Sequence, residues 1–157
     1  KKAGYNNEEI TLVTTPDYPE MYNATLVLQE ELQKIGVNAV VDSNDFSTFM
    51  EHRADPKQFS MYITSNSYAL LPVQLSALNK EWAGLDAPEV TEGIDAIRFA
   101  DSTEDAKTAW ENLQTFLYED GAASVIGHYT SVNALNAKTE GYEFLRYALY
   151  WNTTVSK

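Results

Sequence analysis

Polar and aromatic residues stand at the ends of two short apolar runs, residues 10–15 and 59–64, which predict buried strands. In an open parallel sheet, small molecules bind outside the carboxyl ends of the strands, so the two groups would share one edge. The candidate ligand-binding residues are Thr15, Asp17, Tyr18 and Tyr22 after the first run and Ser65, Asn66, Ser67 and Tyr68 after the second. Two ordinary hydrophilic loops would produce the same pattern, so that interpretation stays open beside the binding site.

The residues that metal binding or catalysis needs are sparse. His52 and His128 are the only histidines, and neither has a second histidine or a paired carboxylate at metal-ligand spacing. The sequence contains no Gly-x-Ser-x-Gly nucleophile motif, no Gly-rich phosphate loop and no dinucleotide fingerprint. Two pairs of carboxylates could act as acid and base. We interpret Asp42 and Asp45 as a turn with a helix cap, and Glu30 and Glu31 as a solvated helix face. We therefore predict no enzyme activity, no metal and no cofactor.

Composition excludes further classes of function. The chain has 157 residues, of which 44% are hydrophobic and 22% are charged, as in ordinary globular domains. Its formal net charge of −12 would repel a nucleic-acid backbone, so we predict no nucleic-acid partner. The absence of cysteine excludes disulfides and thiolate metal sites. No apolar run approaches the roughly 20 residues of a membrane span.

Residues 10–41 predict a strand, a helix and a second strand, and this unit organises the rest of the chain. Both strand segments, 10–15 and 37–41, are short and rich in β-branched side chains. Between them one helical stripe recurs at spacings of three or four residues: Met21, Thr25, Leu28, Leu32 and Ile35. Gly36 follows, where a left-handed residue can close the helix. Two strands joined by such a helix are expected to lie parallel.

The remaining segments extend this unit into a single α/β domain over residues 1–157, with an open, mostly parallel sheet flanked by helices. Helices are predicted over residues 46–53, 70–78 and 89–99, and from a capping segment at 101–105 to about residue 120. Further strand-like segments are 123–126, 131–135 and 147–155. Residues 1–5 look like the last turn of a helix, which predicts that the chain is a fragment.

Several stretches follow one another in an order that is typical of one protein family. They are residues 3–5, 9–12, 28–37, 45–49, the strand at Met61, 110–114, 117–120, 128–130, 138–142 and 150–152. In this succession, which covers nearly the whole chain, the sequence resembles the extracytoplasmic solute-binding proteins of ABC transporters. The branch is family 5, the large peptide-, oligopeptide- and nickel-binding one.

This resemblance implies one lobe of a type II, periplasmic-binding-protein-like clamp. The chain would be the C-terminal lobe, with residues 123–157 returning towards an N-terminal lobe that is missing here. Such proteins close over a small-molecule or peptide ligand and deliver it to a membrane ABC permease. The resemblance also implies an extracytoplasmic location in a bacterium or archaeon, in the periplasm or lipid-anchored at the outer face of the cell membrane.

Departures from the family pattern bear on the ligand. Tyr68 and Leu71 stand where the resemblance leads us to expect acids, one of which meets a peptide's amino group. Thr15 stands where the relatives carry the arginine that pairs with a peptide carboxylate. A buried charged terminus without its partner costs several kcal/mol, so free di- and tripeptides are disfavoured. A longer peptide, a sugar-like molecule or another uncharged solute fits better.

Two alternatives to the import function stay open at this point. A receptor-coupled or scaffolding relative could use the same lobe to signal, and it would form a stable complex with a sensor. A hydrolytic enzyme domain is the other alternative, and detectable turnover by the purified chain would reveal it.

Overall fold

The protein is described here from a computed structural model, in which the chain forms two compact units, Lys1–Phe116 and Leu117–Lys157. The described residues are 4–67, 69, 71–75, 78–79, 85–119, 123–130, 132–145 and 148–156. The single domain predicted over residues 1–157 stays a prediction, because two compact units of one chain can belong to one domain or to two.

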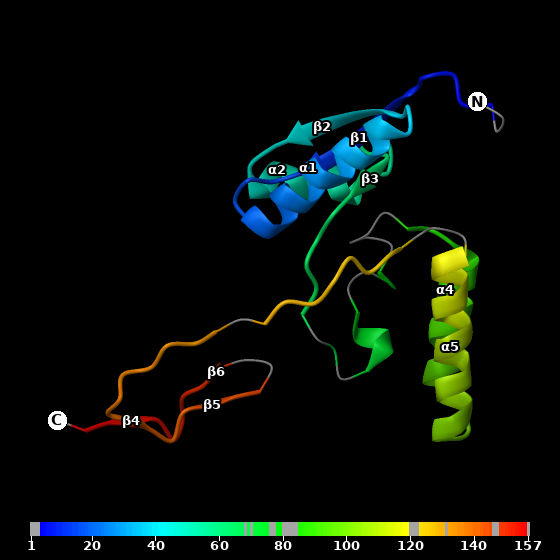
Figure 1. Cartoon of the computed structure of the whole chain (residues 1–157). Coiled ribbons are helices and arrows are strands. Elements are labelled where there is room, and N and C mark those ends of the chain that lie inside the picture. Colours follow the sequence, from blue (N-terminus) through cyan, green and yellow to red (C-terminus); the bar gives the residue numbers. More distant parts are fainter. Residues whose placement is uncertain are drawn as a thin grey trace. The chain divides into compact units, whose positions relative to one another are not determined.

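The first unit contains a three-stranded parallel sheet, in which β1 (Glu9–Thr14) lies between β2 (Asn38–Ser43) and β3 (Met61–Tyr62) (Figure 1). The β1–β2 register runs from Glu9 opposite Asn38 to Thr14 opposite Ser43. On the other side of β1, Leu12 lies opposite Met61. The α/β class and the parallel pairing of the first two strands are therefore confirmed.

Helix α1 (Pro19–Lys34) connects β1 to β2 and ends as the sequence predicts. Pro19 occupies the first turn, where its missing N–H leaves no helix hydrogen bond unmade. Gly36 has a φ of +83° and its N–H donates to the Gln33 carbonyl over 2.9 Å, so the predicted left-handed end is confirmed. The predicted stripe is wrong at its last position, because Ile35 lies beyond the final helical turn and is exposed.

Helix α2 (Phe46–Ala54) supplies the main ring of the core. The buried cluster consists of Val13 from β1, Met21 from α1 and Phe49 from α2. Met50, Phe59 and Tyr62 pack against it and are partly buried. Since Leu12 and Val13 are adjacent in an extended strand, their fully buried side chains point to opposite faces of the sheet. Both faces of β1 are therefore covered.

Two elements predicted between α2 and the next helix, a strand and a helix, are shorter than expected. The strand predicted over residues 59–64 is reduced to β3, and at its start the Ser60 hydroxyl accepts from the Thr11 N–H over 3.2 Å. A side-chain oxygen thus takes the place of a backbone carbonyl as the acceptor for one strand hydrogen bond. The helix predicted over residues 70–78 is wrong in its described part, where only the 3₁₀ turn η1 (Pro72–Gln74) forms. Leu75 adopts an extended backbone and stops the turn.

Helices α4 (Pro88–Arg98) and α5 (Thr103–Glu119) form where the sequence predicts helices, and together they make a hairpin (Figure 1). The Ser102 hydroxyl accepts from the Asp105 N–H over 3.1 Å and caps α5. Gly93 is in contact with Leu113, and a Cβ at position 93 would lie 3.0 Å from a Leu113 methyl group. The small residue therefore lets the two helices approach closely.

The second unit differs from the predicted tail. Its strands form two antiparallel pairs, β4 (Thr139–Glu140) with β7 (Thr154–Val155) and β5 (Glu143–Phe144) with β6 (Ala148–Leu149). The strands predicted over residues 123–126 and 131–135 are wrong for the residues described there, which extend without a partner strand. The strand predicted over 147–155 is interrupted by a turn, in which the Thr153 N–H donates to the Tyr150 carbonyl over 2.9 Å.

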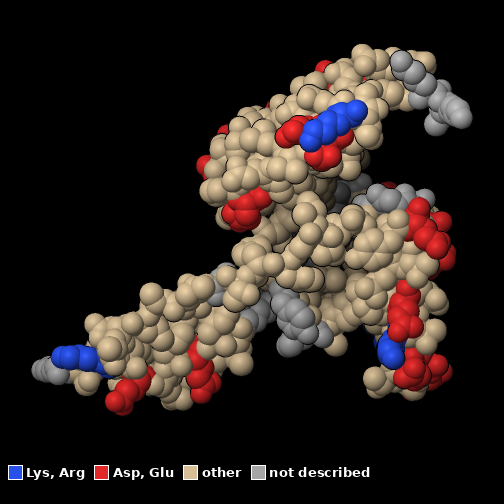
Figure 2. All heavy atoms as spheres, viewed as in Figure 1, with Lys and Arg blue, Asp and Glu red and all other residues tan. Residues whose placement is uncertain are grey.

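Acidic side chains outnumber basic ones on the face drawn in Figure 2, in keeping with the net charge of −12. The exposed pair Glu30 and Glu31 both lie close to Lys34, at 2.9 and 2.8 Å, which confirms a solvated helix face. Its hydrogen bond to Glu31, which has the larger effect, and its hydrogen bond to Glu30 raise the pKa of Lys34. Among the described residues, no helix is both long and apolar enough to cross a membrane.

Candidate ligand-binding edge

The strand order creates a switch point at one edge of the sheet. The chain passes from β1 to β2 on one side and then returns to β3 on the other side of β1. In open α/β sheets, the crevice between the loops that leave a switch point is where ligands bind. We call this end of the sheet the carboxyl edge, formed by residues 14–18, 43–46 and 63–67. Of the residues singled out in the sequence, Thr15, Asp17 and Tyr18 follow β1 and Ser65, Asn66 and Ser67 follow β3, so these six belong to this edge.

Thr15 and Asp17 have structural partners at this edge. Thr15 is fully buried, and its hydroxyl accepts from the Asp17 N–H over 3.3 Å. The Asp17 carboxylate in turn accepts from the N–H of Phe46 over 2.8 Å. This bond joins the loop after β1 to the first residue of α2. Both side chains therefore hold the edge together, and a buried Thr15 offers no surface to a solute.

The start of α2 is capped by Asp45. One carboxylate oxygen of Asp45 accepts from the N–H groups of Ser47 and Thr48, over 3.0 and 3.1 Å. The other accepts from the Thr48 hydroxyl over 2.8 Å. The hydrogen bond from the Thr48 hydroxyl, which has the largest effect, and the one from the Thr48 N–H lower the pKa of Asp45. Since Asp17 already binds the Phe46 N–H, the first donors of α2 are occupied, and its positive end is neutralised by acids of the chain.

A row of aromatic rings runs from the core to the surface of the carboxyl edge. Phe49 is fully buried, and its ring lies 6.2 Å from that of Phe46 at an interplanar angle of 26°. The Phe46 ring lies 4.9 Å from that of Tyr18. Tyr18 is 41% exposed and Phe46 is 38% exposed. Tyr22, one turn into α1, is half-buried.

The loop after β3 meets a buried cation that the sequence analysis did not single out. Arg53 is only 6% exposed, and its Nη1 donates to the Thr64 hydroxyl over 3.3 Å. The guanidinium lies 5.8 Å from the centre of the Phe49 ring and 5.9 Å from that of Tyr62. Burial lowers the pKa of Arg53, and the electrostatic interaction with Tyr62 opposes this shift. Burial also raises the pKa of Tyr62.

The other candidate residues after β3 lie beyond this contact. Ser65, Asn66 and Ser67 are exposed. Tyr68 lies outside the described residues. No signal in the sequence distinguishes Arg53 from an exposed helical arginine, because its burial depends on β3, which follows it in the chain. Phe46 belongs to the helix predicted over residues 46–53, but the pattern did not reveal that it reaches the candidate edge.

A separate hydrogen-bonded group closes the end of β2. The His52 Nδ1 lies 3.0 Å from one Asp42 oxygen, and the Asn44 amide donates to the other over 2.9 Å. Asp42 lies in β2, opposite Val13, and links this strand to α2. Of the predicted turn with a helix cap, the cap by Asp45 is therefore confirmed, whereas Asp42 belongs to the strand. In the described part of the chain, no group of three or more His, Asp or Glu side chains could hold a metal ion.

An open groove of about 590 Å³ lies between α4 and α5. Its lining includes the apolar residues Phe99, Ala109 and Leu113 and four acids: Glu89, Glu92, Asp101 and Asp105. Leu113 belongs to the interface with Gly93, so the groove continues the hairpin's own packing surface. We therefore take the carboxyl edge, with its strand-end loops, as the candidate site.

Comparison with known proteins shows a partial similarity and no match to a family model. No family model matches the chain. The sequence is similar to a protein of Sinorhizobium fredii named "Probable peptide ABC transporter periplasmic-binding protein", with 34% identity over 74 residues. The match covers 44% of this chain and only 14% of the relative's length. The chain is thus similar in part to a solute-binding protein.

Proposed function

We propose that this chain is part of the substrate-binding component of an ABC importer and closes, as the C-terminal lobe of a type II clamp, over a peptide or other small solute. The observation that carries the proposal is the similarity to the periplasmic-binding protein of Sinorhizobium fredii. The switch point between β1 and β3 supports it, because a ligand-binding crevice is expected there. A binding role without turnover agrees with the relative's name.

The partners follow from the same proposal. An N-terminal lobe of the same protein supplies the other half of the cleft, and a membrane ABC permease receives the ligand. The location is extracytoplasmic, in the periplasm or lipid-anchored at the outer face of the cell membrane. The exposed or half-exposed candidates for ligand contact are Tyr18, Ser65, Asn66 and Ser67 at the carboxyl edge and Tyr22 in the first turn of α1, and Tyr68 remains a proposed contact.

The test is native mass spectrometry of the complete parent protein, purified without unfolding, beside this chain alone. We expect the parent to retain a small molecule and the chain alone to be empty, because half of the cleft leaves most ligand surface in water. A parent that is empty and that stays empty against pools of peptides and sugars would contradict the proposal.

A further inference from the structure

We infer that Phe46 and Tyr18 form an aromatic subsite at the carboxyl edge that receives an aromatic or large apolar side chain of a peptide ligand. This inference rests on the proposed function and adds to it the kind of group that is recognised. It also assigns ligand contact to Phe46, which the strand-end pattern did not include, and withdraws it from the buried Thr15.

The rings are presented as a surface that a ligand can cover. Both residues keep more than a third of their area exposed, although they are in contact with each other at 4.9 Å between ring centres. Their planes are inclined by 58°, so the pair forms an angled surface. Aromatic faces of this kind recognise apolar groups and other rings by packing and by edge-to-face contact.

The subsite is held rigid by bonds on both sides. The Asp17 carboxylate binds the Phe46 N–H, and the cap by Asp45 fixes the first turn of α2. Behind Phe46, the ring of the fully buried Phe49 supports it from the core. A surface that is already ordered loses little conformational entropy when a ligand binds, which favours affinity.

The charges at this edge disfavour an anionic ligand group. Residues 4–67 contain three Lys or Arg side chains, Lys34, Arg53 and Lys57, and one histidine, His52, whose Nδ1 lies 3.0 Å from an Asp42 oxygen. Lys34 ends α1 just before β2 and Lys57 lies just before β3, so both belong to the opposite edge of the sheet. Arg53 is buried against Phe49 and Tyr62. The carboxyl edge itself carries Asp17 and Asp45, which repel a carboxylate but not an uncharged ring.

The test uses the complete parent protein and end-blocked alanine peptides that carry one varied residue: Phe, Leu, Ala, Lys or Glu. Affinity is measured by titration calorimetry for the wild type, Phe46→Ala, Phe46→Leu and the control Val27→Ala. Val27 is an exposed apolar residue in the middle of α1, so Val27→Ala controls for the truncation of an exposed apolar side chain away from the carboxyl edge. Phe46→Leu keeps an apolar group of similar size, which guards against a variant that fails to fold.

For the wild type we expect the Phe peptide to bind best and the Glu peptide worst. Phe46→Ala should weaken the Phe peptide about tenfold and leave the Ala peptide unchanged, with Phe46→Leu between them. Equal affinities for wild type and Phe46→Ala, preference for the Lys or Glu peptide, or no binding of any peptide would each overturn the inference. If one of these results is obtained but the parent binds another solute, the proposed function stands without the aromatic subsite. A parent that binds no solute at all would contradict both the subsite and the proposed function.

Discussion

The sheet layer of the first unit, residues 9–62, and the second unit both contain runs of apolar and β-branched residues, yet only the sheet layer buries them. Leu12 and Val13 of β1 are fully buried. In the second unit, Val125 and Ile126 are exposed, and Val132 is 91% exposed. An apolar run therefore becomes a buried strand only where a partner strand and a covering helix are at hand.

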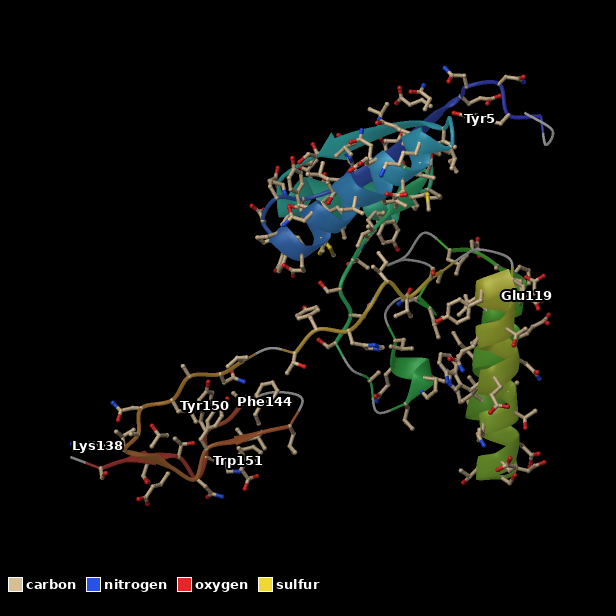
Figure 3. All side chains as sticks on the ribbon, in the orientation of Figure 1. Tyr5, Glu119, Lys138, Phe144, Tyr150 and Trp151 are labelled. Atoms are coloured by element: carbon tan, nitrogen blue, oxygen red, sulfur yellow. The ribbon has the colours of Figure 1, made fainter. Side chains whose placement is uncertain are left out.

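The difference comes from what surrounds each strand. β1 has a parallel neighbour on each side, and helices supply Met21 and Phe49 to its core. Each strand of the second unit has two residues and one described partner. Phe144, Tyr150 and Trp151, which come from the β5–β6 hairpin and the turn that follows it, remain exposed (Figure 3). Isolated two-stranded pairs are marginal in water because they bury too little apolar surface.

The largest effect on stability is expected when one phenylalanine in each region is truncated to alanine. Phe49→Ala opens a cavity in the fully buried cluster and should lower the free energy of unfolding by about 3–5 kcal/mol. Phe144→Ala removes a ring that is 51% exposed and should cost less than about 1 kcal/mol. Urea unfolding monitored by circular dichroism measures both. Equal losses would contradict the difference in packing.

A second pair of substitutions separates the cost of a positive φ from the cost of a steric collision. Gly36 and Gly141 both have a positive φ, but a Cβ at Gly141 would collide with the Asn152 carbonyl, whereas the space around Gly36 is open. Gly36→Ala should cost about 1 kcal/mol of stability, and Gly141→Ala should cost more. Hydrogen exchange should show lost protection at β4 and β7 in Gly141→Ala while the amides of β1 stay protected. Loss at β1 as well would show that the two units unfold together.

Asp45 should make the sheet layer sensitive to acid. Because its pKa is lowered in the folded chain, its stabilising effect is complete above the ordinary value of 3.8 and is lost as the pH falls through the lowered pKa. Asp45→Ala should reduce the unfolding temperature by a few degrees at neutral pH, and its difference from the wild type should shrink in acid. Asp45→Asn keeps the cap without the titrating group, so it is the matched control. A difference that does not change with pH would contradict this role.

A small gain in stability is expected at a buried hydroxyl. The Thr14 Oγ1 is buried and has no hydrogen-bond partner among the residues that the structure describes. Thr14→Val replaces this group by a methyl of similar size and should raise the free energy of unfolding by about 1 kcal/mol. The control is Thr25→Val, since the buried Thr25 hydroxyl donates to the Met21 carbonyl over 2.9 Å and the substitution should bring no gain. A gain at both positions, or at neither, would contradict the assignment.

Much of the sheet layer could be predicted because its signals are local. The stripe of α1, the left-handed Gly36 and the cap by Asp45 depend on residues within a few positions of one another. The strand-end groups could be predicted for the same reason, since each directly follows its strand. The proposed role of these groups in binding was reached from the general position of ligands at switch points.

Tertiary structure alone decided which of those residues are available to a ligand. Asp17 binds the Phe46 N–H across 29 positions of sequence, and Thr15 is buried beside it. The burial of Arg53 depends on its contact with Tyr62 in β3.

The sequence by itself thus determined the class of fold, the parallel strands and the edge at which ligands are expected. The packing of distant segments determined which side chains at that edge are exposed, and which apolar runs of the second unit find a partner. The physical reason is that local hydrogen bonds and periodicity act within a few residues, whereas burial depends on contacts between segments that the sequence does not place side by side.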